Sequence, residues 1–479
     1  MGKGTKKSGR QSSPRKGVTK GRDKGLGLVH PNAAGIDIGS REHYVAVPED
    51  RCEESVRRFT SFTRDLYELA DWLTASGIET VAMESTGVYW IPLYDILSER
   101  GFEVYLVNAR HVKHVSGRKT DVSDCQWLQK LHSYGLLSGA FRPDTAICEV
   151  RSYQRHRDML VSQVATHTLH IQKALTQMNL QVHHVLSDIT GVTGMKIVRA
   201  IIAGERDGKV LSGYRDGRCK ESQEVIEKSL QGHYRAEHVF SLKQAVELYD
   251  IYHEKIEACD DEIEKLLKRF EGRVDLEKTE VPKEKRLNRR GNSNAPKFDL
   301  HSELYRITGV NLCALPGLNS YSVFKLLSEV GLDMSRWKSA KQFCSWLGLC
   351  PKNKISGGKV LSSRTQRSAN RAAGIFRLCA STLYRSQTAL GAFYRRMKAR
   401  IGGPEAVTAA AHKLARLFYT LLKEGKAYSE RGQDYYEMTY RARVTNNLKK
   451  RAKQLGFELV ALPDNEPTAP QKKPYGTTT

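Results

Sequence analysis

The sequence predicts an α/β domain near the N-terminus, followed by a helical middle region and a mostly α-helical C-terminal domain. Three observations support this prediction. Apolar residues alternate with polar ones soon after residue 28, apolar residues recur with 3-4 spacing between 242 and 270, and polar, basic stretches separate such segments. A period of two indicates strands, whereas 3-4 spacing indicates helices. A chain of 479 residues suffices for about three domains.

The first domain, expected over residues 29–143, begins with three short strands in succession. These are AAGIDIGS, EHYVAVPED and ESVRRFT, separated by charged turns. A helix ending at Gly77 follows, with one apolar face made by Phe62, Leu66, Leu69, Trp72 and Leu73. Then come the strand TVAMES, a helix from about 88 to 100, the strand EVYLVN and a helix that begins at DVSD. The order β-β-β-α-β-α-β-α is that of a ribonuclease-H-like (RuvC-like) domain.

The middle region, residues 144–272, is expected to be helical with a coiled-coil seam. The seam comprises Leu242, Ala245, Tyr249, Tyr252, Ile256, Cys259, Ile263, Leu266 and Phe270. Either a second copy of the chain or another helix of the same chain can cover such a seam, and we slightly favour oligomerisation.

The remaining boundaries follow from composition. Residues 1–28 are a basic arm with almost nothing to bury, expected to be disordered, and 273–300 form a polar, basic linker. A C-terminal domain is expected over 301–462, followed by a loose tail over 463–479.

The charge of the chain predicts a polyanionic partner. Lys and Arg number 77 against 53 Asp and Glu, which gives a net charge of +24, and the pI is about 9.6. Nucleic acid is the preferred partner, because each Lys or Arg placed on a phosphate releases counterions. The alternatives are a basic tail on an unrelated enzyme and a membrane-surface protein. No apolar run is long enough to span a membrane.

The nine cysteines include no C-x-x-C pair. This pattern favours reduced thiols in a cytosolic compartment and argues against a zinc site. The neighbouring His183 and His184 lack partners at ligand spacing, so we interpret them as surface or packing residues.

Four acidic residues in the first domain are candidate metal ligands: Asp37, Glu84, Asp121 and Asp124. Carboxylates that converge on one point repel one another unless cations lie between them, and Mg²⁺ prefers oxygen ligands. Two such ions would favour phosphoryl transfer. The alternative is that Asp121, Asp124 and Glu84 cap helices. An acid between two isoleucines in a strand, as at Asp37, is costly unless paired or metal-bound. Basic residues just before Asp121 are candidates to hold phosphate: Lys113, Arg118 and Lys119.

Two motifs stand out in the C-terminal half. LCALPGLNSYSVFKLLSEVG reads as a helix, a Pro-Gly-Leu turn and a second helix, similar to helix-hairpin-helix modules that present backbone N–H groups to DNA phosphates. KNKISGGKVLSSRTQRSANRAAG places Ser356 before two glycines among basic residues. Such a loop is usually only a phosphate-binding turn, and no His at a readable spacing offers a general base.

The sequence resembles the DEDD transposases of the insertion-sequence-110 family, specifically the branch with a longer middle region. The matching stretches are GIDIGS, MESTGVYW, the KTDVSD run, the Pro-Gly-Leu hairpin, GLCPKNKISGGK and NNLKKRAKQLGFELV. They extend over nearly the whole chain from about residue 33 to 460. Two features depart from the family pattern: Ala369-Asn370 stands where Gly-Asn is usual, and the N-terminal arm is longer than typical.

The resemblance implies a mobile-element transposase that recombines DNA and binds both DNA and RNA. In such a transposase, Mg²⁺, or Mn²⁺ in its place, is bound by Asp37, Glu84, Asp121 and Asp124. Ser356 forms a covalent phosphoserine link to DNA. It further implies a structured bridge RNA as guide, donor and target DNA as substrates, dimers that join into tetramers, and a prokaryotic cytoplasm with nucleoid association as the location. Downstream candidates to hold the phosphate are Lys359, Arg364, Arg367 and Arg371, which otherwise form a solvated basic face. The alternatives are a Mg²⁺-dependent RuvC-like junction resolvase or nuclease that uses water, and a nucleic-acid-binding scaffold.

Overall fold

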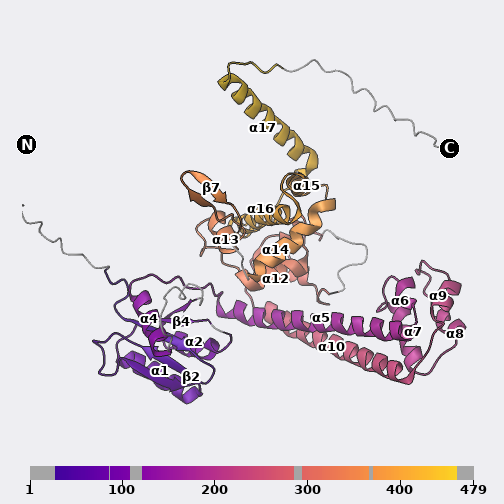
Figure 1. Ribbon diagram of the computed structural model, residues 1–479, viewed down its shortest axis with the longest axis horizontal. Coiled ribbons are helices and arrows are strands. Elements are labelled where there is room, and N and C mark those ends of the chain that lie inside the picture. The colour runs from indigo at the N-terminus through magenta and orange to yellow at the C-terminus, as the bar shows by residue number, and fades with distance from the viewer. Residues whose placement is uncertain (1–26, 86, 108–120, 285–293, 366–369, 461–479) are drawn as a thin grey trace, which may run out of the picture. The chain divides into compact units, whose positions relative to one another are not determined.

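The computed structural model describes residues 27–85, 87–107, 121–284, 294–365 and 370–460 (Figure 1). The chain divides into two compact units, Met1–Arg142 and Pro143–Thr479, each of which is described by itself. The expected basic arm up to residue 26 and the expected tail lie outside the described residues. Among the helices that the structure describes, none is long and apolar enough to cross a membrane.

The first unit is built on a five-stranded mixed sheet in the order β3-β2-β1-β4-β5. The first three strands form an antiparallel meander, and β4 and β5 add parallel to β1. The elements are β1 (Ala33–Ile38), β2 (Glu42–Ala46), β3 (Val56–Thr60), α1 (Thr63–Ala75), β4 (Thr80–Glu84), α2 (Trp90–Glu99), β5 (Glu103–Val107) and α4 (Asp121–Ser133). The expected order of three strands followed by alternating helices and strands is found within the described residues. It is consistent with a ribonuclease-H-like fold.

The two faces of the sheet are covered by different helices. On one face Ile36 and Ile38 of β1 join the buried side chains of α1 and α2 in one apolar cluster. Neighbouring residues of a strand point to opposite faces, so Gly35 and Asp37 face the other way. The backbone of α4 lies against Gly35, so α4 covers that second face.

The second unit begins with a long helical hairpin. Its arms are α5 (Thr145–Gln177) and α10 (Ala236–Lys268), which lie side by side (Figure 1). The arms are antiparallel, since Cys259 contacts the Tyr153 carbonyl whereas Tyr252 stacks on His167. Short helices between the arms close the far end: α6 (Val182–Val185), α7 (Val192–Ile202), α8 (Gly208–Gly213) and α9 (Gln223–Ser229). Much of the predicted seam is buried against α5 or these helices, so packing within the chain accounts for it.

A buried ion pair fixes the hairpin in register. The Arg157 guanidinium on α5 donates two hydrogen bonds to the Asp260 carboxylate on α10, and both side chains are at most 5% exposed. Arg157 also donates to the Tyr321 hydroxyl at 2.9 Å. Because Tyr321 lies on α12 (Ser320–Val330), this network ties the hairpin to the helices that follow.

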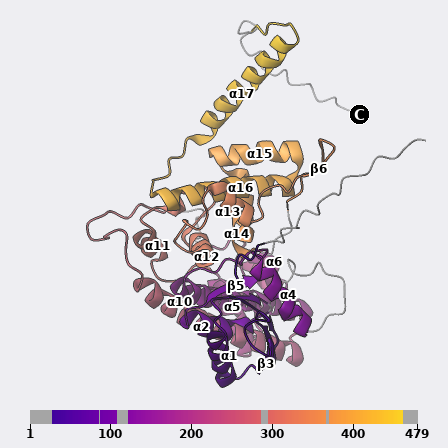
Figure 2. The same ribbon diagram turned by 90° about the vertical axis from the view of Figure 1, so that its left-hand side faces the viewer.

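The rest of the unit is mostly helical. Its elements are α11 (Leu300–Thr308), the 3-10 turn η1 (Leu312–Ala314), α12, α13 (Ala340–Trp346), β6 (Lys354–Ser356), β7 (Lys359–Ser362), α14 (Arg371–Ser381), the 3-10 turn η2 (Thr382–Arg385), α15 (Ala389–Ile401), α16 (Gly403–Glu424) and α17 (Gly432–Gln454). Figure 2 shows α15 lying along α16. Before the Pro-Gly-Leu turn, the expected first helix is reduced to the turn η1. Gly309 ends α11 at a positive φ of 72°, and Pro316 follows soon after, which leaves no room for a full helix.

Candidate functional site

A close backbone contact brings α4 against the middle of β1. A Cβ atom on Gly35 would lie 2.3 Å from the backbone nitrogen of Gln129 and 2.4 Å from the carbonyl oxygen of Cys125. Only glycine allows this approach, because no side chain separates the helix from the strand. Asp37 is two residues further along β1 and points to the same face. The first turn of α4, which carries Asp121 and Asp124, is therefore brought toward Asp37.

Glu84 reaches the same region from the neighbouring strand. It is the last residue of β4, which runs parallel to β1 with Ile36 opposite Met83. The next positions along the two strands are Asp37 and Glu84, so both acids lie near the carboxyl ends of adjacent strands. Such strand ends are where ligands commonly bind in open α/β sheets.

The electrostatics of Asp37 indicate that the four acids interact. Burial, together with the negative charges of Asp121, Asp124 and Glu84, raises the pKa of Asp37 from its ordinary value of 3.8 to about 6. Next to it, burial and the charges of Asp37 and Asp124 help to raise the pKa of the Cys125 thiol to about 12. Cys125 is therefore a neutral packing residue beneath the acids.

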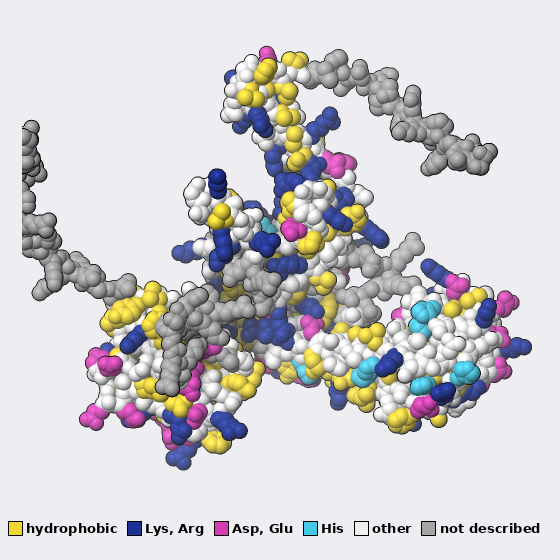
Figure 3. Space-filling view, in the orientation of Figure 1, with side chains coloured by type: hydrophobic (Ala, Val, Ile, Leu, Met, Phe, Trp, Pro, Cys, Tyr) yellow, Lys and Arg dark blue, Asp and Glu magenta, His cyan; other side chains and the backbone are white. Residues whose placement is uncertain are grey.

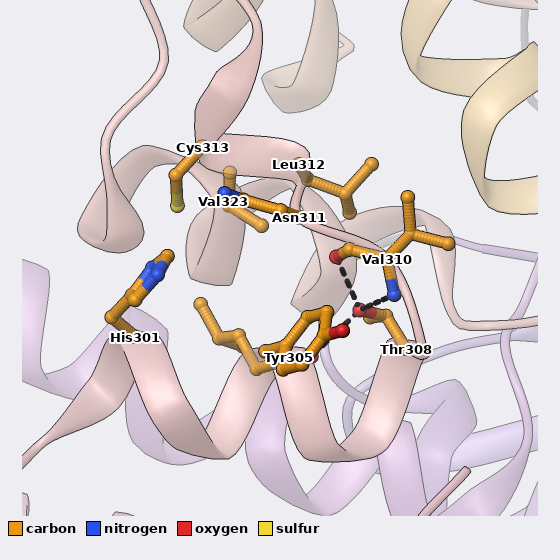
Figure 4. Close-up of a pocket in the computed structure, with 9 residues that line it drawn as sticks. His301, Tyr305, Thr308, Val310, Asn311, Leu312, Cys313 and Val323 are labelled. Carbon is orange, nitrogen blue, oxygen red and sulfur yellow. Dashed lines mark hydrogen bonds between the residues drawn. The ribbon is translucent and has the colours of Figure 1, made fainter. Parts of the chain in front are cut away.

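The four acids do not close tightly around one point. Among the described residues, three other side chains do bring their possible ligand atoms within 4.8 Å of one another. They are Glu284, His301 and Cys313. Figure 4 shows His301 and Cys313 pointing toward one another in a small pocket next to α11. A thiol, an imidazole and a carboxylate suit zinc better than magnesium. The spacing of these residues in the sequence gives no sign of the group.

Two members of this group also have structural roles. A Glu284 carboxylate oxygen accepts a hydrogen bond of 2.7 Å from the backbone nitrogen of Ser320, the first residue of α12. The Nε2 atom of His301 lies 2.7 Å from the Pro282 carbonyl oxygen. These bonds tie the segment that ends at residue 284 to α11 and α12.

Ser356 lies at the tip of an exposed β-hairpin. It is the last residue of β6 and pairs with Lys359 of β7, with Gly357 and Gly358 between them at φ values of 55° and 75°. Two consecutive residues at positive φ are typical of a tight two-residue hairpin turn, which explains the Gly-Gly sequence. Sequence reasoning treated the segment as a loop and missed this hairpin, although two glycines between short runs are a hairpin signal.

The hydroxyl of Ser356 makes no hydrogen bond within the part of the chain that the structure describes. Lys359 and Arg364 belong to the same exposed segment, and Arg371 begins α14. Asn370 caps that helix, since its side chain accepts from the Ala373 nitrogen at 3.1 Å. Arg367 and the predicted phosphate-binding residues Lys113, Arg118 and Lys119 lie outside the described residues. The four acids belong to the first unit, whereas Ser356 belongs to the second.

The fold and these side chains agree with an enzyme that acts on nucleic acid, and comparison with known proteins specifies the family. Residues 34–180 match the model of the DEDD transposases of IS110, and residues 310–395 match the model described as transposase IS116/IS110/IS902 family. The first match contains the four acids and extends into α5, and the second contains Ser356. No curated protein matches the chain. The chain belongs to the IS110 family of DEDD transposases, enzymes that act on DNA.

Proposed function

We propose that this protein cuts and rejoins DNA strands of a mobile element through a covalent bond between Ser356 and a DNA phosphate. In this proposal Asp37, Glu84, Asp121 and Asp124 hold Mg²⁺, or Mn²⁺ in its place, at the scissile phosphodiester. The observation that carries the proposal is the position of Asp37, a half-buried acid whose pKa is raised by burial and by three other acids of the first unit. Such an arrangement is costly for folding and is typical of functional sites.

The donor set fits a hard divalent cation. All four side chains offer only carboxylate oxygens, which are the ligands that Mg²⁺ prefers, and their charges repel one another when nothing lies between them. When bound, such an ion would withdraw electron density from the scissile phosphate and stabilise the negative charge that develops on it.

Ser356 is suited to act as a nucleophile on a large substrate. Its side chain is exposed at a hairpin tip, with Lys359 opposite it to attract a phosphate. In the proposed step the Ser356 oxygen bonds to phosphorus, one DNA oxygen leaves as a hydroxyl, and the serine proton passes through solvent to that oxygen. The number of phosphate ester bonds is unchanged, so the reverse step can join a new DNA end without a high-energy cofactor.

Two finer features of the proposal rest on the family resemblance. A structured bridge RNA would select donor and target DNA by base pairing, and dimers would join into tetramers. The net charge of +24 is compatible with both nucleic acids. Sequencing the RNA that co-purifies with the protein tests the first feature, and a single defined RNA is the expected result. Light scattering of the RNA-bound protein tests the second.

The serine chemistry is tested by a denaturing gel. Wild-type protein incubated with its RNA, labelled DNA and Mg²⁺ should give a protein–DNA adduct that survives denaturation, and Ser356→Ala should abolish it. Ser363→Ala is a matched control, because Ser363 is an exposed serine just beyond the same hairpin. Recombination at the wild-type rate by Ser356→Ala would refute the proposal.

The runner-up is a metal-dependent junction resolvase or nuclease in which water attacks the phosphate. It is favoured by the placement of the acids in a unit that lacks Ser356. Cleavage without an adduct, lost in Asp37→Asn but retained in Ser356→Ala, would support it. Nucleic-acid binding without any cleavage would instead indicate a scaffold.

A further inference from the structure

A second concave site lies in the C-terminal unit, where α15, α16 and α17 meet. It has a volume of about 390 Å³, within the range of about 300–1,000 Å³ of ligand pockets. Figure 3 shows Lys and Arg side chains gathered where α17 meets the rest of this unit. Four cationic side chains line the site, which we call the basic pocket: Arg396, Arg400, Lys413 and Arg443.

The cations of the basic pocket have no acidic partner. None of its lining residues is acidic, and none of the four cations takes part in an ion pair with another described residue. Lys413 is half-buried, and burial together with the charges of Arg443 and Arg416 lowers its pKa. Like charges held together in this way destabilise the fold, so their placement calls for an anion that binds between them.

Aromatic rings hold two of these cations, Arg396 and Lys413, in position without neutralising them. The guanidinium carbon of Arg396 lies 3.4 Å from the ring centroid of Tyr440 and 5.6 Å from that of Tyr436. The Nζ atom of Lys413 lies 3.7 Å from the ring centroid of Phe393. Arginine fixed on an aromatic face keeps its N–H groups available for phosphate oxygens.

The combination of cations and rings distinguishes between polyanions. An acidic peptide would use the charges but not the rings, whereas a nucleic-acid strand offers both phosphates and bases that stack on aromatic faces. We propose that the basic pocket binds a phosphodiester group of a nucleic-acid strand, with a neighbouring base against the rings of α17. The choice of ligand rests on the proposed function, in which the protein handles DNA and RNA. Both nucleic acids offer the same group, and the experiment below separates them.

Binding is measured by fluorescence anisotropy on full-length protein that carries Ser356→Ala, so that no covalent capture intervenes. The probes are mixed-sequence single-stranded DNA, duplex DNA and single-stranded RNA of about 20 nucleotides, longer than the roughly 4–16 that one single-strand-binding module covers. Arg443→Gln and Arg396→Gln should each weaken binding about five- to tenfold and reduce the dependence of log Kd on log salt by about 1. Arg443→Lys, which keeps the charge, should retain most of the salt dependence. The probe with the largest loss identifies the ligand as DNA or RNA.

A matched control and a stability measurement separate binding from folding. Arg441→Gln changes an exposed arginine on the same helix that does not line the pocket, and it should alter Kd by less than about twofold. Because no carboxylate loses a partner, Arg443→Gln should leave the Tm of the free protein unchanged or raise it. A lowered Tm would indicate a structural role and count against the proposal.

If Arg396→Gln and Arg443→Gln bind all three probes with the affinity and salt dependence of wild type, the proposal is overturned. This holds even if wild-type protein forms the Ser356 adduct. Conversely, the expected losses in a protein that forms no adduct would refute the serine chemistry and leave the basic pocket as a nucleic-acid site.

Discussion

Gly35 on β1 lies directly beneath Gln129 on α4, so close that a methyl group on Gly35 would stand 2.3 Å from the Gln129 backbone nitrogen. This contact sets the distance between the strand that carries Asp37 and the helix that carries Asp121 and Asp124. The candidate metal site therefore depends on a residue that has no side chain.

Gly35→Ala should destabilise the first unit, because the new methyl group meets backbone atoms that cannot rotate away. The expected loss is about 3 kcal/mol, at the upper end of overpacking effects, and urea unfolding followed by tryptophan fluorescence measures it. Gly374→Ala is the control. Gly374 is exposed in α14 with nothing within 4 Å of its would-be Cβ, so this change should stabilise the protein slightly. Equal stability of the two variants would contradict the close contact.

Asp37→Asn should remove a pH-dependent loss of stability. The carboxyl titrates near 3.8 in the unfolded chain and near 6 in the folded one, so between these values the folded state holds more protons. The contribution of Asp37 to the stability of the metal-free protein therefore falls as pH rises through this window, by about 2–3 kcal/mol. Buried His132, whose pKa is lowered to about 4, acts in the opposite direction over a similar range. The difference in unfolding free energy between wild type and Asp37→Asn, measured between pH 4 and 7, isolates the Asp37 contribution and should shift against wild type as pH rises.

Saturating Mg²⁺ should flatten this pH-dependent difference, because a cation bound to wild-type protein neutralises the acids. Glu99→Gln, at an exposed position at the end of α2, should keep the pH dependence of wild-type protein. A metal-free difference between wild type and Asp37→Asn that does not change across the window would contradict the interaction of the acids.

The buried pair of Arg157 and Asp260 should be far more important for folding than an exposed pair. Arg157→Met leaves Asp260 charged and buried, at an expected cost of about 3–5 kcal/mol. The double variant Arg157→Met/Asp260→Leu should recover much of this loss, since no unpaired charge remains. Arg199→Met breaks an exposed pair with Asp250 and should cost less than about 1 kcal/mol. A double-mutant cycle with no coupling would contradict the buried pair.

The hairpin turn should control adduct formation without affecting overall stability. Gly358→Val places a β-branched residue at a φ of 75° and should displace Ser356, which reduces adduct yield at least about tenfold. Gly357→Asn should retain the adduct, because Asn-Gly favours this turn. Both variants should unfold like wild type, since residues 351–361 are exposed. Equal adduct yields would remove the turn from the mechanism.

The sequence was sufficient to predict the order of elements in the first unit. Short runs of alternating apolar residues between charged turns mark β1 to β3, and the positions of Asp37 and Glu84 follow from the strands that carry them. The approach of α4 to β1 also needed Gly35, which contacts residues about 90 positions further along the chain. No local pattern reports such a contact.

Elsewhere, local patterns left a choice that only the tertiary structure settles. The seam of α10 has the same spacing whether a second chain or α5 covers it, and the structure places α5 against it. The basic pocket combines residues of three helices between 393 and 443. Each of its cations, taken alone, reads as part of a solvated helix face.

The helical hairpin has a defined length. Its arm α5 has 33 residues, which at about 1.5 Å per residue is about 50 Å, the length of about 15 base pairs of duplex DNA. The pairing of Arg157 with Asp260 prevents the two arms from sliding, so this length is fixed. A molecule bound to α6 to α9 at the tip would therefore lie about 50 Å from the base of the hairpin, which equals about one and a half helical turns of DNA. The hairpin thus fixes the distance between its tip and its base.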